Sequence, residues 1–363
     1  MRFRLIKYLK YAIFLFIYLM ACNSNPFVPD NGKPRNSAFG GVNHLVMVCD
    51  LDSWEGALGD SLRYYFESAY PILPQPEPIF DLRHMEYKDV IGIPTRRELR
   101  NYLFVADLSK TDSASLNFLN KLIGTEKLKA HLEQSEYSNL LTRDVWAHGQ
   151  QLMYLIGKNE GDLLARLKRS FPGISKAIRD FDNTTIKAAA YSFGDAKLIN
   201  KDLTARYGIQ IDIPADFKEA SFKPQGTWLR KETDKASLNL IISKVKYKST
   251  DQFKEKGIKE LRDSISRHFI RTNSEGDYMQ VNDIALPTFL YQKNIDGNYG
   301  VELRGVWETK IEYMGGPFQT YLFQTPDKTS IVYVDAFVYA PEMEKRNLIQ
   351  HLETIVNTFR YPK

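Results

Sequence analysis

The sequence predicts an α+β protein with two α/β-layer domains, the second built on a mainly antiparallel sheet packed by two helices. In the first half, apolar runs of strand length alternate with segments whose apolar residues recur at helical spacing. In the second half, strand-like runs follow one another too closely for helical crossovers, so antiparallel hairpins join them best. The 363 residues, 43% of them hydrophobic, suffice for two folded cores.

The first domain is expected at residues 41–205, where strands and helices alternate. A proline-dense loop at 71–78 interrupts this alternation, because proline fixes φ and lacks the backbone N–H that a helix needs. The third helix should break at Pro172-Gly173. We expect strands at 44–50, 79–84, 101–107, 143–147 and 151–156, and helices at 54–69, 113–132, 162–181 and 184–205.

The second domain is expected at residues 206–363. Ile209, Ile211 and Ile213 alternate with polar residues, which is typical of a half-buried strand. Segments 253–269 and 348–359 carry apolar residues on one helical face each. The last strand, 331–339, is apolar on both faces, as a central strand would be. The remaining strands are expected at 227–232, 238–247, 285–292, 299–309 and 319–324.

The chain begins with the three parts of a bacterial export signal. A basic segment with Arg2, Arg4, Lys7 and Lys10 precedes an uncharged apolar run at 11–20. This run is about half of the roughly 20 residues that span a bilayer, which favours a cleaved signal over a membrane helix.

The residues Leu19-Met20-Ala21-Cys22 resemble the lipobox of bacterial lipoproteins, although Met20 departs from its usual small residue. The resemblance implies a signal peptide at 1–21, cleavage before Cys22 and a membrane lipid on the Cys22 thiol. Residues 22–40, rich in Asn and Pro, then form a flexible tether. Asn23 is not the Asp that commonly retains lipoproteins at the inner membrane, so we expect an outer-membrane anchor facing the periplasm of a Gram-negative envelope. The alternative is an ordinary cleaved signal with an incidental cysteine.

The net charge argues against nucleic-acid binding, and the cysteine content argues against a disulfide within the chain. The formal net charge is +5, and the signal segment contributes four of these charges, so the remainder lacks the basic excess that nucleic-acid binding needs. If Cys22 carries lipid, Cys49 has no partner in the chain. Cys49 lies in a strand-like apolar run, where we expect a buried, inert thiol.

Two family resemblances concern the fold. The run YGIQIDIPADF at 207–217, with the following long helix and the helix ending at 355–359, resembles the PsbP/Mog1-like fold, an α/β/α sandwich found mostly in binding and assembly proteins. The chain from Cys22 onward also resembles an uncharacterised lipoprotein family, domain-of-unknown-function family forty-eight thirty-seven. The matching segments are PQPEPIFD at 74–81, YMGGPF at 313–318 and AFVYAP at 336–341. That family has no assigned activity.

One segment suggests an enzyme. The strand-like run that ends in Asp50-Leu51-Asp52 resembles the first motif of haloacid-dehalogenase-type phosphatases, in which one Asp is the nucleophile, the next an acid/base, and both help hold Mg²⁺. The alternative is that Asp52 or Ser53 caps the following helix. The sequence offers no partner Lys, no later acidic pair at a strand end, no zinc-ligand spacing, no nucleophile elbow and no phosphate loop. We therefore expect no metal or cofactor.

Binding residues are instead expected in three regions. Gly315 and Gly316 link two strands, either as a simple turn or as a close backbone approach to a ligand, with Arg304 and Trp307 on the preceding strand as anchors. The second region is around Trp54, and the third is the loop around Glu77. The alternative for this loop is a rigid crossover without a binding role. We expect a non-catalytic binding or scaffolding lipoprotein whose partner is an envelope protein or a small ligand. The alternative is a Mg-dependent phosphatase-like hydrolase.

Overall fold

The computed structural model describes residues 35–133 and 140–362, which form two compact units. Unit 1 contains the described residues up to Ser68 together with Phe80–Phe181. Unit 2 contains Ala69–Ile79 and the chain from Asp182 onward. The expected segments, 41–205 and 206–363, divide the chain differently, because residues 182–205 and the whole proline-dense loop at 71–78 pack with unit 2.

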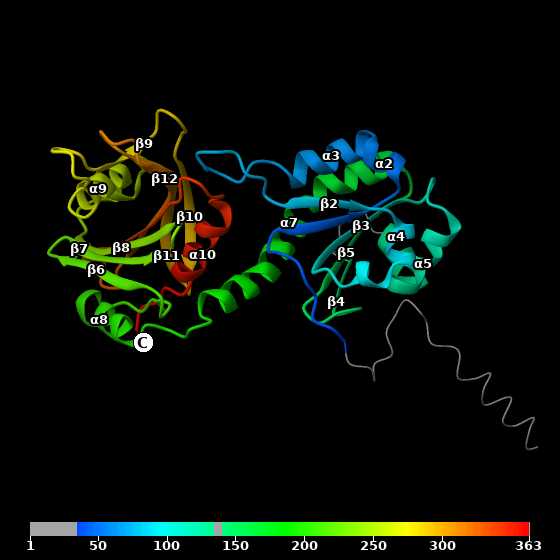
Figure 1. The fold of residues 1–363 in the computed structure, drawn as a ribbon, viewed down its shortest axis with the longest axis horizontal. Helices are drawn as coiled ribbons and strands as arrows, with labels where there is room; N and C mark the ends of the chain where they lie inside the picture. Colours follow the sequence, from blue (N-terminus) through cyan, green and yellow to red (C-terminus); the bar gives the residue numbers. More distant parts are fainter. Residues whose placement is uncertain (1–34, 134–139, 363) are drawn as a thin grey trace, which may run out of the picture. The chain divides into compact units, whose positions relative to one another are not determined.

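Unit 1 is a parallel α/β unit whose sheet has the strand order β2-β1-β3-β5-β4. Only β4 is antiparallel to its neighbour. Figure 1 shows α4 and α5 on one side of this sheet and α3 and α7 on the other. The strands are β1 (His44–Val48), β2 (Asp81–Met85), β3 (Asn101–Asp107), β4 (Leu140–Arg143) and β5 (Gln151–Gly157). The helices are α2 (Leu51–Glu55), α3 (Ala57–Phe66), α4 (Tyr87–Gly92), η1 (Pro94–Arg97), α5 (Ser113–Ile123), α6 (Thr125–Glu133) and α7 (Glu160–Ala190), of which α7 continues into unit 2 from Asp182.

Several helix boundaries in the first half differ from expectation. Gly124, with φ 93°, ends α5 and separates it from α6, because a left-handed φ terminates a helix. Helix α7 continues through Pro172 instead of breaking there. Proline removes one helical hydrogen bond, but Leu167 and Ile174 on either side of it are buried, and this packing holds the helix together. The strand expected at 143–147 lies earlier, as β4.

Unit 2 is built on an eight-stranded antiparallel sheet with the order β10-β11-β12-β13-β8-β7-β6, and β9 pairs with β11. Its strands are β6 (Lys218–Lys223), β7 (Gly226–Glu232), β8 (Ser237–Lys246), β9 (Met279–Asn282), β10 (Phe289–Ile295), β11 (Asn298–Thr309), β12 (Gly315–Gln324) and β13 (Ser330–Tyr339). Its helices are α8 (Lys197–Tyr207), η2 (Thr250–Phe253), α9 (Glu255–Ser266) and α10 (Arg346–Val356).

The alternation along β13 explains the three layers of unit 2. Val332 and Val334 point into a core shared with α8 and α10, whereas Ile331 and Tyr333 point into a core shared with α9. Figure 1 shows α9 and α10 on opposite sides of the sheet. The predicted α+β class, with an antiparallel C-terminal sheet and the two expected helices packed on it, is confirmed, and α8 adds a third helix.

The alternating isoleucines do not form the predicted strand. Gln210 makes only an isolated bridge with Arg360, while Ile209, Ile211 and Ile213 are all buried in the core beside α8. Side chains of α8 satisfy part of this extended backbone, since Thr204 donates to the Ile209 carbonyl and Asn200 accepts from the Ile213 N–H. The alternating pattern therefore arises because an extended segment buries its isoleucines, although this segment does not pair with a strand of the sheet.

Residues Ala69–Ile79, which we call the docking segment, leave the chain of unit 1 and pack into unit 2. Tyr70 and Leu73 join the core that contains α10. The Glu77 carboxylate accepts hydrogen bonds from the backbone N–H groups of Lys345, at 2.6 Å, and Arg346, at 2.8 Å, where α10 begins. Glu77 is 6% exposed, so this predicted binding residue is committed to the fold.

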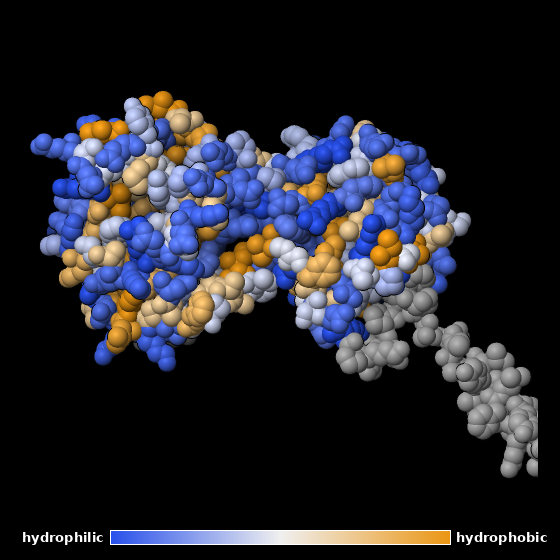
Figure 2. Space-filling view, viewed as in Figure 1, coloured by the Kyte–Doolittle hydropathy of each residue, from blue (hydrophilic) through white to orange (hydrophobic). Residues whose placement is uncertain are grey.

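Figure 2 shows that the visible surfaces of both units are mostly hydrophilic, with scattered hydrophobic spots. Among the described residues, none of the helices is both long enough and apolar enough to span a bilayer.

We predict that Glu77→Gln lowers the free energy of unfolding by about 2–3 kcal/mol, because the amide replaces one of the two charged acceptors with a donor that faces backbone N–H groups. Urea unfolding followed by tryptophan fluorescence measures this change. Glu275→Gln, at an exposed position of the same unit, is the matched control and should stay within about 0.5 kcal/mol. Equal stability of the two variants would contradict the role assigned to Glu77.

Candidate functional site

A cavity of about 230 Å³ lies on the α9 face of the sheet in unit 2. Helix α9 ends at Ser266, and the chain that follows it, Phe269 to Arg271, forms one wall. Sheet residues and Met314, which directly precedes β12, form the rest. The lining residues are Trp228, Arg230, Ser237, Asn239, Phe269, Ile270, Arg271, Trp307, Met314, Phe337 and Tyr339.

Strand register brings the sheet residues of the cavity together. Arg230 of β7 pairs with Asn239 of β8, and Asn239 pairs with Phe337 of β13. Residues two apart on a strand share a face, so Trp228 and Tyr339 lie on the same side as these three. Neighbouring strands thus supply an aromatic floor.

The polar groups of the floor bind one another. The Trp228 indole N–H donates to Asn239 Oδ1 at 3.0 Å, and Asn239 Nδ2 donates to Ser237 Oγ at 3.0 Å. Arg230 Nε also donates to Ser237 Oγ, at 2.9 Å. The Trp307 indole donates to the Val338 carbonyl at 3.2 Å. Since both indole N–H groups are satisfied, the tryptophans are fixed in place and offer apolar surface to a ligand.

One predicted residue lines this cavity, and two others lie beside it in the sheet. Trp307 lines it directly, and it lies opposite Gly316 in the β11–β12 ladder, with Gly315 next along the strand. A Cβ on Gly316 would lie 2.0 Å from the Val338 carbonyl oxygen, and one on Gly315 would lie 2.8 Å from the Trp307 carbonyl oxygen. The glycines therefore allow a close approach of the chain to itself, which positions the Trp307 wall, and they lie within β12 rather than in a turn.

Arg304, the fourth residue expected at this site, points to the opposite face of the sheet. It contacts the carboxylates of Glu302 and Glu353 and the hydroxyl of Tyr70 in the docking segment. Burial alone would lower the pKa of Arg304, but Glu353 and Glu302 raise it well above its usual value. Arg304 therefore stabilises the α10 face and has no part in the cavity.

Trp54 and the two aspartates lie in unit 1, near the carboxyl end of β1. Asp50 occupies the position before α2, where its side chain makes no capping hydrogen bond, and Asp52 lies in the first turn. The expected cap by Asp52 or Ser53 is therefore wrong, because the helix already begins at Leu51. The Trp54 ring stacks on His84 at 4.9 Å.

The strand order adds one residue that the sequence did not indicate. Asp107 ends β3, which lies beside β1, so Asp107 and Asp50 share the carboxyl edge where open α/β sheets commonly bind ligands. Asp107 is 4% exposed, and its Oδ1 accepts from the N–H and hydroxyl of Ser109. Burial, then the Asp112 and Glu86 carboxylates, raise the pKa of Asp50.

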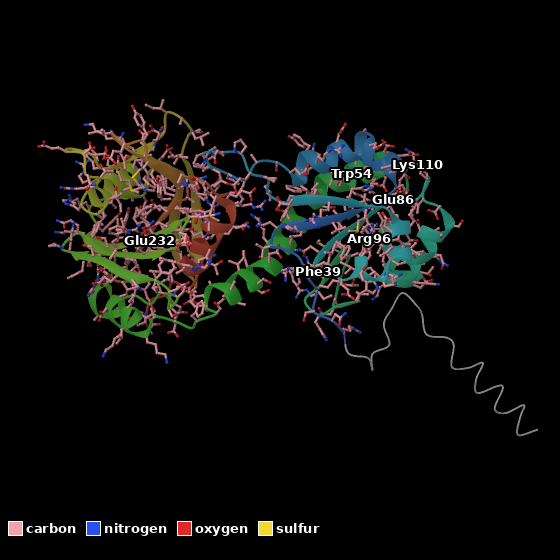
Figure 3. All side chains as sticks on the ribbon, in the orientation of Figure 1. Phe39, Trp54, Glu86, Arg96, Lys110 and Glu232 are labelled. Carbon is pink, nitrogen blue, oxygen red and sulfur yellow. The ribbon has the colours of Figure 1, made fainter. Side chains whose placement is uncertain are left out.

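Figure 3 shows Trp54, Glu86 and Lys110 at this edge of unit 1, with Phe39 at the other end of the strands. Lys110 pairs with Glu160 at 2.6 Å. Within residues 35–133 and 140–362, no three His, Cys, Asp or Glu side chains are grouped so that they could hold a metal ion.

The two cysteines differ in what the structure says about them. Cys22 lies outside the described residues. Cys49 is a free thiol with 1% exposure, as expected, and burial raises its pKa to about 12. A thiol so rarely ionised is a poor nucleophile at neutral pH.

We predict that Asp50→Asn stabilises the protein at pH 7 and that this gain shrinks toward pH 4. The pKa of Asp50 is raised in the folded protein, so its ionisation costs stability as the pH rises through that value, and the cost disappears once both states are protonated. Urea midpoints at the two pH values measure the difference. Asp52→Asn is the control, and a gain from Asp50→Asn that is equal at both pH values would contradict the prediction.

Comparisons with known proteins match both halves of the chain to families without an assigned activity. Residues 38–193 match a domain of unknown function (DUF8532), and residues 196–358 match a domain of unknown function (DUF4837). No curated protein matches the chain.

Three solved structures are similar to part of the chain. The Ran-binding protein Mog1p of Saccharomyces cerevisiae is 10% identical, with a TM-score of 0.28 over 42% of this chain and 90% of Mog1p. LpqN, involved in cell envelope biogenesis of Mycobacterium tuberculosis, is 10% identical, with a TM-score of 0.27 over 42% of this chain and 83% of LpqN. A Bacteroides thetaiotaomicron protein is 10% identical, with a TM-score of 0.25 over 43% of this chain and 46% of that one.

Residues 196–358, which contain the motifs at 313–318 and 336–341, match the DUF4837 family that the sequence resembled, whereas the motif at 74–81 lies in the segment that matches DUF8532.

Proposed function

We propose that this protein is a non-catalytic binding protein of the cell envelope, held at the outer membrane by acyl chains on Cys22 and facing the periplasm. In this proposal, unit 2 takes an apolar group of a ligand into the cavity beside α9. The observation that supports binding is the cavity itself, with five aromatic side chains among its lining residues: Trp228, Phe269, Trp307, Phe337 and Tyr339.

The cavity has the features of a binding site rather than a catalytic one. Ligand pockets are mostly apolar and contain a few placed polar groups. The serine hydroxyl in the lining, Ser237 Oγ, is bonded to Arg230 and Asn239, and the lining residues supply no general base beside it. The volume of about 230 Å³ has room for one small apolar group of a ligand.

The anchor is supported by the export signal and the lipobox-like residues that end at Cys22. Each buried methylene contributes about 0.8 kcal/mol, and a single chain binds only reversibly, so the diacylglycerol and amide-linked chains of a lipoprotein would hold the protein permanently.

We predict that the protein incorporates a clickable palmitate analogue in growing cells and that Cys22→Ser abolishes this labelling. Gel fluorescence of the purified full chain measures it. Cys49→Ser is the matched control and should keep the label, because the Cys49 thiol is buried. Label that persists in Cys22→Ser would remove the proposed anchor.

We predict that the full chain binds the neutral probe 4-phenylbutan-1-ol and that Met314→Trp weakens this binding at least ten-fold, because the larger side chain fills the cavity. Titration calorimetry in one fixed detergent measures both affinities. Tyr313→Trp, at a 95% exposed position of the same hairpin, is the control and should bind as the unaltered protein does. Equal affinity of Met314→Trp would place binding outside the cavity.

The alternative function is a Mg-dependent phosphatase-like hydrolase that uses Asp50 and Asp52. The position of Asp50 beside Asp107 at the carboxyl edge of a parallel sheet is the observation that favours it. Phosphoester turnover that requires Mg²⁺ and is lost in Asp50→Asn would establish this alternative in place of the binding role.

A further inference from the structure

We propose that the cavity of unit 2 selects a compact carboxylic acid with an apolar body, and that Arg271 at the rim is the residue that recognises the carboxylate. This inference rests on the proposed function, because it assigns a ligand class to the same cavity.

The charges around the cavity favour an anion. Arg230 and Arg271 line it, and the Lys223 ammonium lies 5.4 Å from the centre of the Phe269 ring. Glu232, labelled in Figure 3, compensates Arg230 through an ion pair. Lys223 donates to a backbone carbonyl, that of His268. The rim therefore carries more positive than negative charge.

Arg271 is the cation that remains available to a ligand. Its Nε donates to the Arg267 carbonyl at 2.8 Å, which fixes the stem of the side chain. In the part of the chain that the structure describes, no carboxylate forms an ion pair with it. Its two terminal nitrogens can therefore bind both oxygens of a carboxylate, the geometry that suits a guanidinium.

The aromatic floor of the cavity favours an apolar body for the rest of the ligand. Trp228 Nε1, Asn239 and Ser237 satisfy one another, so the interior offers aromatic surface and few polar groups to a ligand. The volume accommodates one aromatic ring or a short aliphatic chain. One uncompensated guanidinium matches the single charge of a carboxylate better than the double charge of a phosphate monoester.

The experiment compares an acid with its uncharged amide. Full-length protein in one fixed detergent is titrated with 4-phenylbutyrate, octanoate and 4-phenylbutyramide by calorimetry. We expect 4-phenylbutyrate to bind about three- to five-fold more tightly than its amide, as an exposed ion pair of up to ~1 kcal/mol allows. The ratio of the phenylbutyrate and octanoate affinities shows whether the apolar body is aromatic or aliphatic, and tighter binding of 4-phenylbutyrate than of its own amide supports the proposal.

Two variants test whether Arg271 causes the preference for the acid over its amide. In Arg271→Gln the acid and the amide should bind equally. Arg267→Gln is the matched control, because Arg267 is exposed, lies four residues earlier and does not line the cavity, so it should keep the preference. Equal binding of acid and amide by the unaltered protein, or a preference that survives in Arg271→Gln, overturns the proposal. If only the preference for a carboxylate is wrong, 4-phenylbutan-1-ol still binds in the cavity. If the proposed binding function is wrong, none of the probes binds in the cavity.

Discussion

The organisation of unit 2 depends on the contact between the Glu77 carboxylate and the backbone N–H groups where α10 begins. The first N–H groups of a helix have no partner within the helix, and the helix dipole makes this end attractive to an anion. Glu77 supplies that anion from a segment 268 residues earlier in the chain. By fixing the docking segment there, it brings Tyr70 and Leu73 into the core beneath α10.

The two faces of the sheet in unit 2 consequently differ. On one face, α8, α10 and the docking segment pack together, and Arg304 links Glu302, Glu353 and Tyr70. On the other face, α9 is held by an ion pair between Arg262 and Asp335, both fully buried and 3.0 Å apart. Such a pair adds little net stability, because desolvation offsets it, but we infer that it fixes where α9 sits. Beyond the end of α9 the sheet is left with the aromatic cavity.

The helices and strands that the sequence predicts correctly are those with a clear local periodicity of apolar residues. Alternation along 331–339 predicts a central strand, and the spacing of Leu348, Leu352 and Ile355 predicts α10. Separately, the motifs at 313–318 and 336–341 resemble the DUF4837 family, whose model matches residues 196–358. Periodicity misleads at Ile209 to Ile213, where an extended segment buries the same alternating side chains without joining a sheet.

The candidate site is harder to predict, because it depends on contacts between distant residues. Nothing local distinguishes Glu77 from a solvent-exposed glutamate in a proline-rich loop, and only the position of α10 reveals its role. Asp107 becomes a neighbour of Asp50 only through the strand order. Trp307 and the glycine pair were recognised from the hairpin pattern, but Arg304, three residues from Trp307, lies on the opposite face because strand positions alternate. Arg271 follows a helix end and carries no sequence signal of its own.

The role of Glu77 is tested most directly by hydrogen–deuterium exchange at the backbone amides of Lys345 and Arg346, its two donors. We expect both amides to be protected as strongly as those within α10, although the first N–H groups of a helix ordinarily exchange rapidly. Fast exchange at both amides in the folded, full-length protein would show that the docking segment does not bind α10, and Glu77 could not then be the contact that organises unit 2.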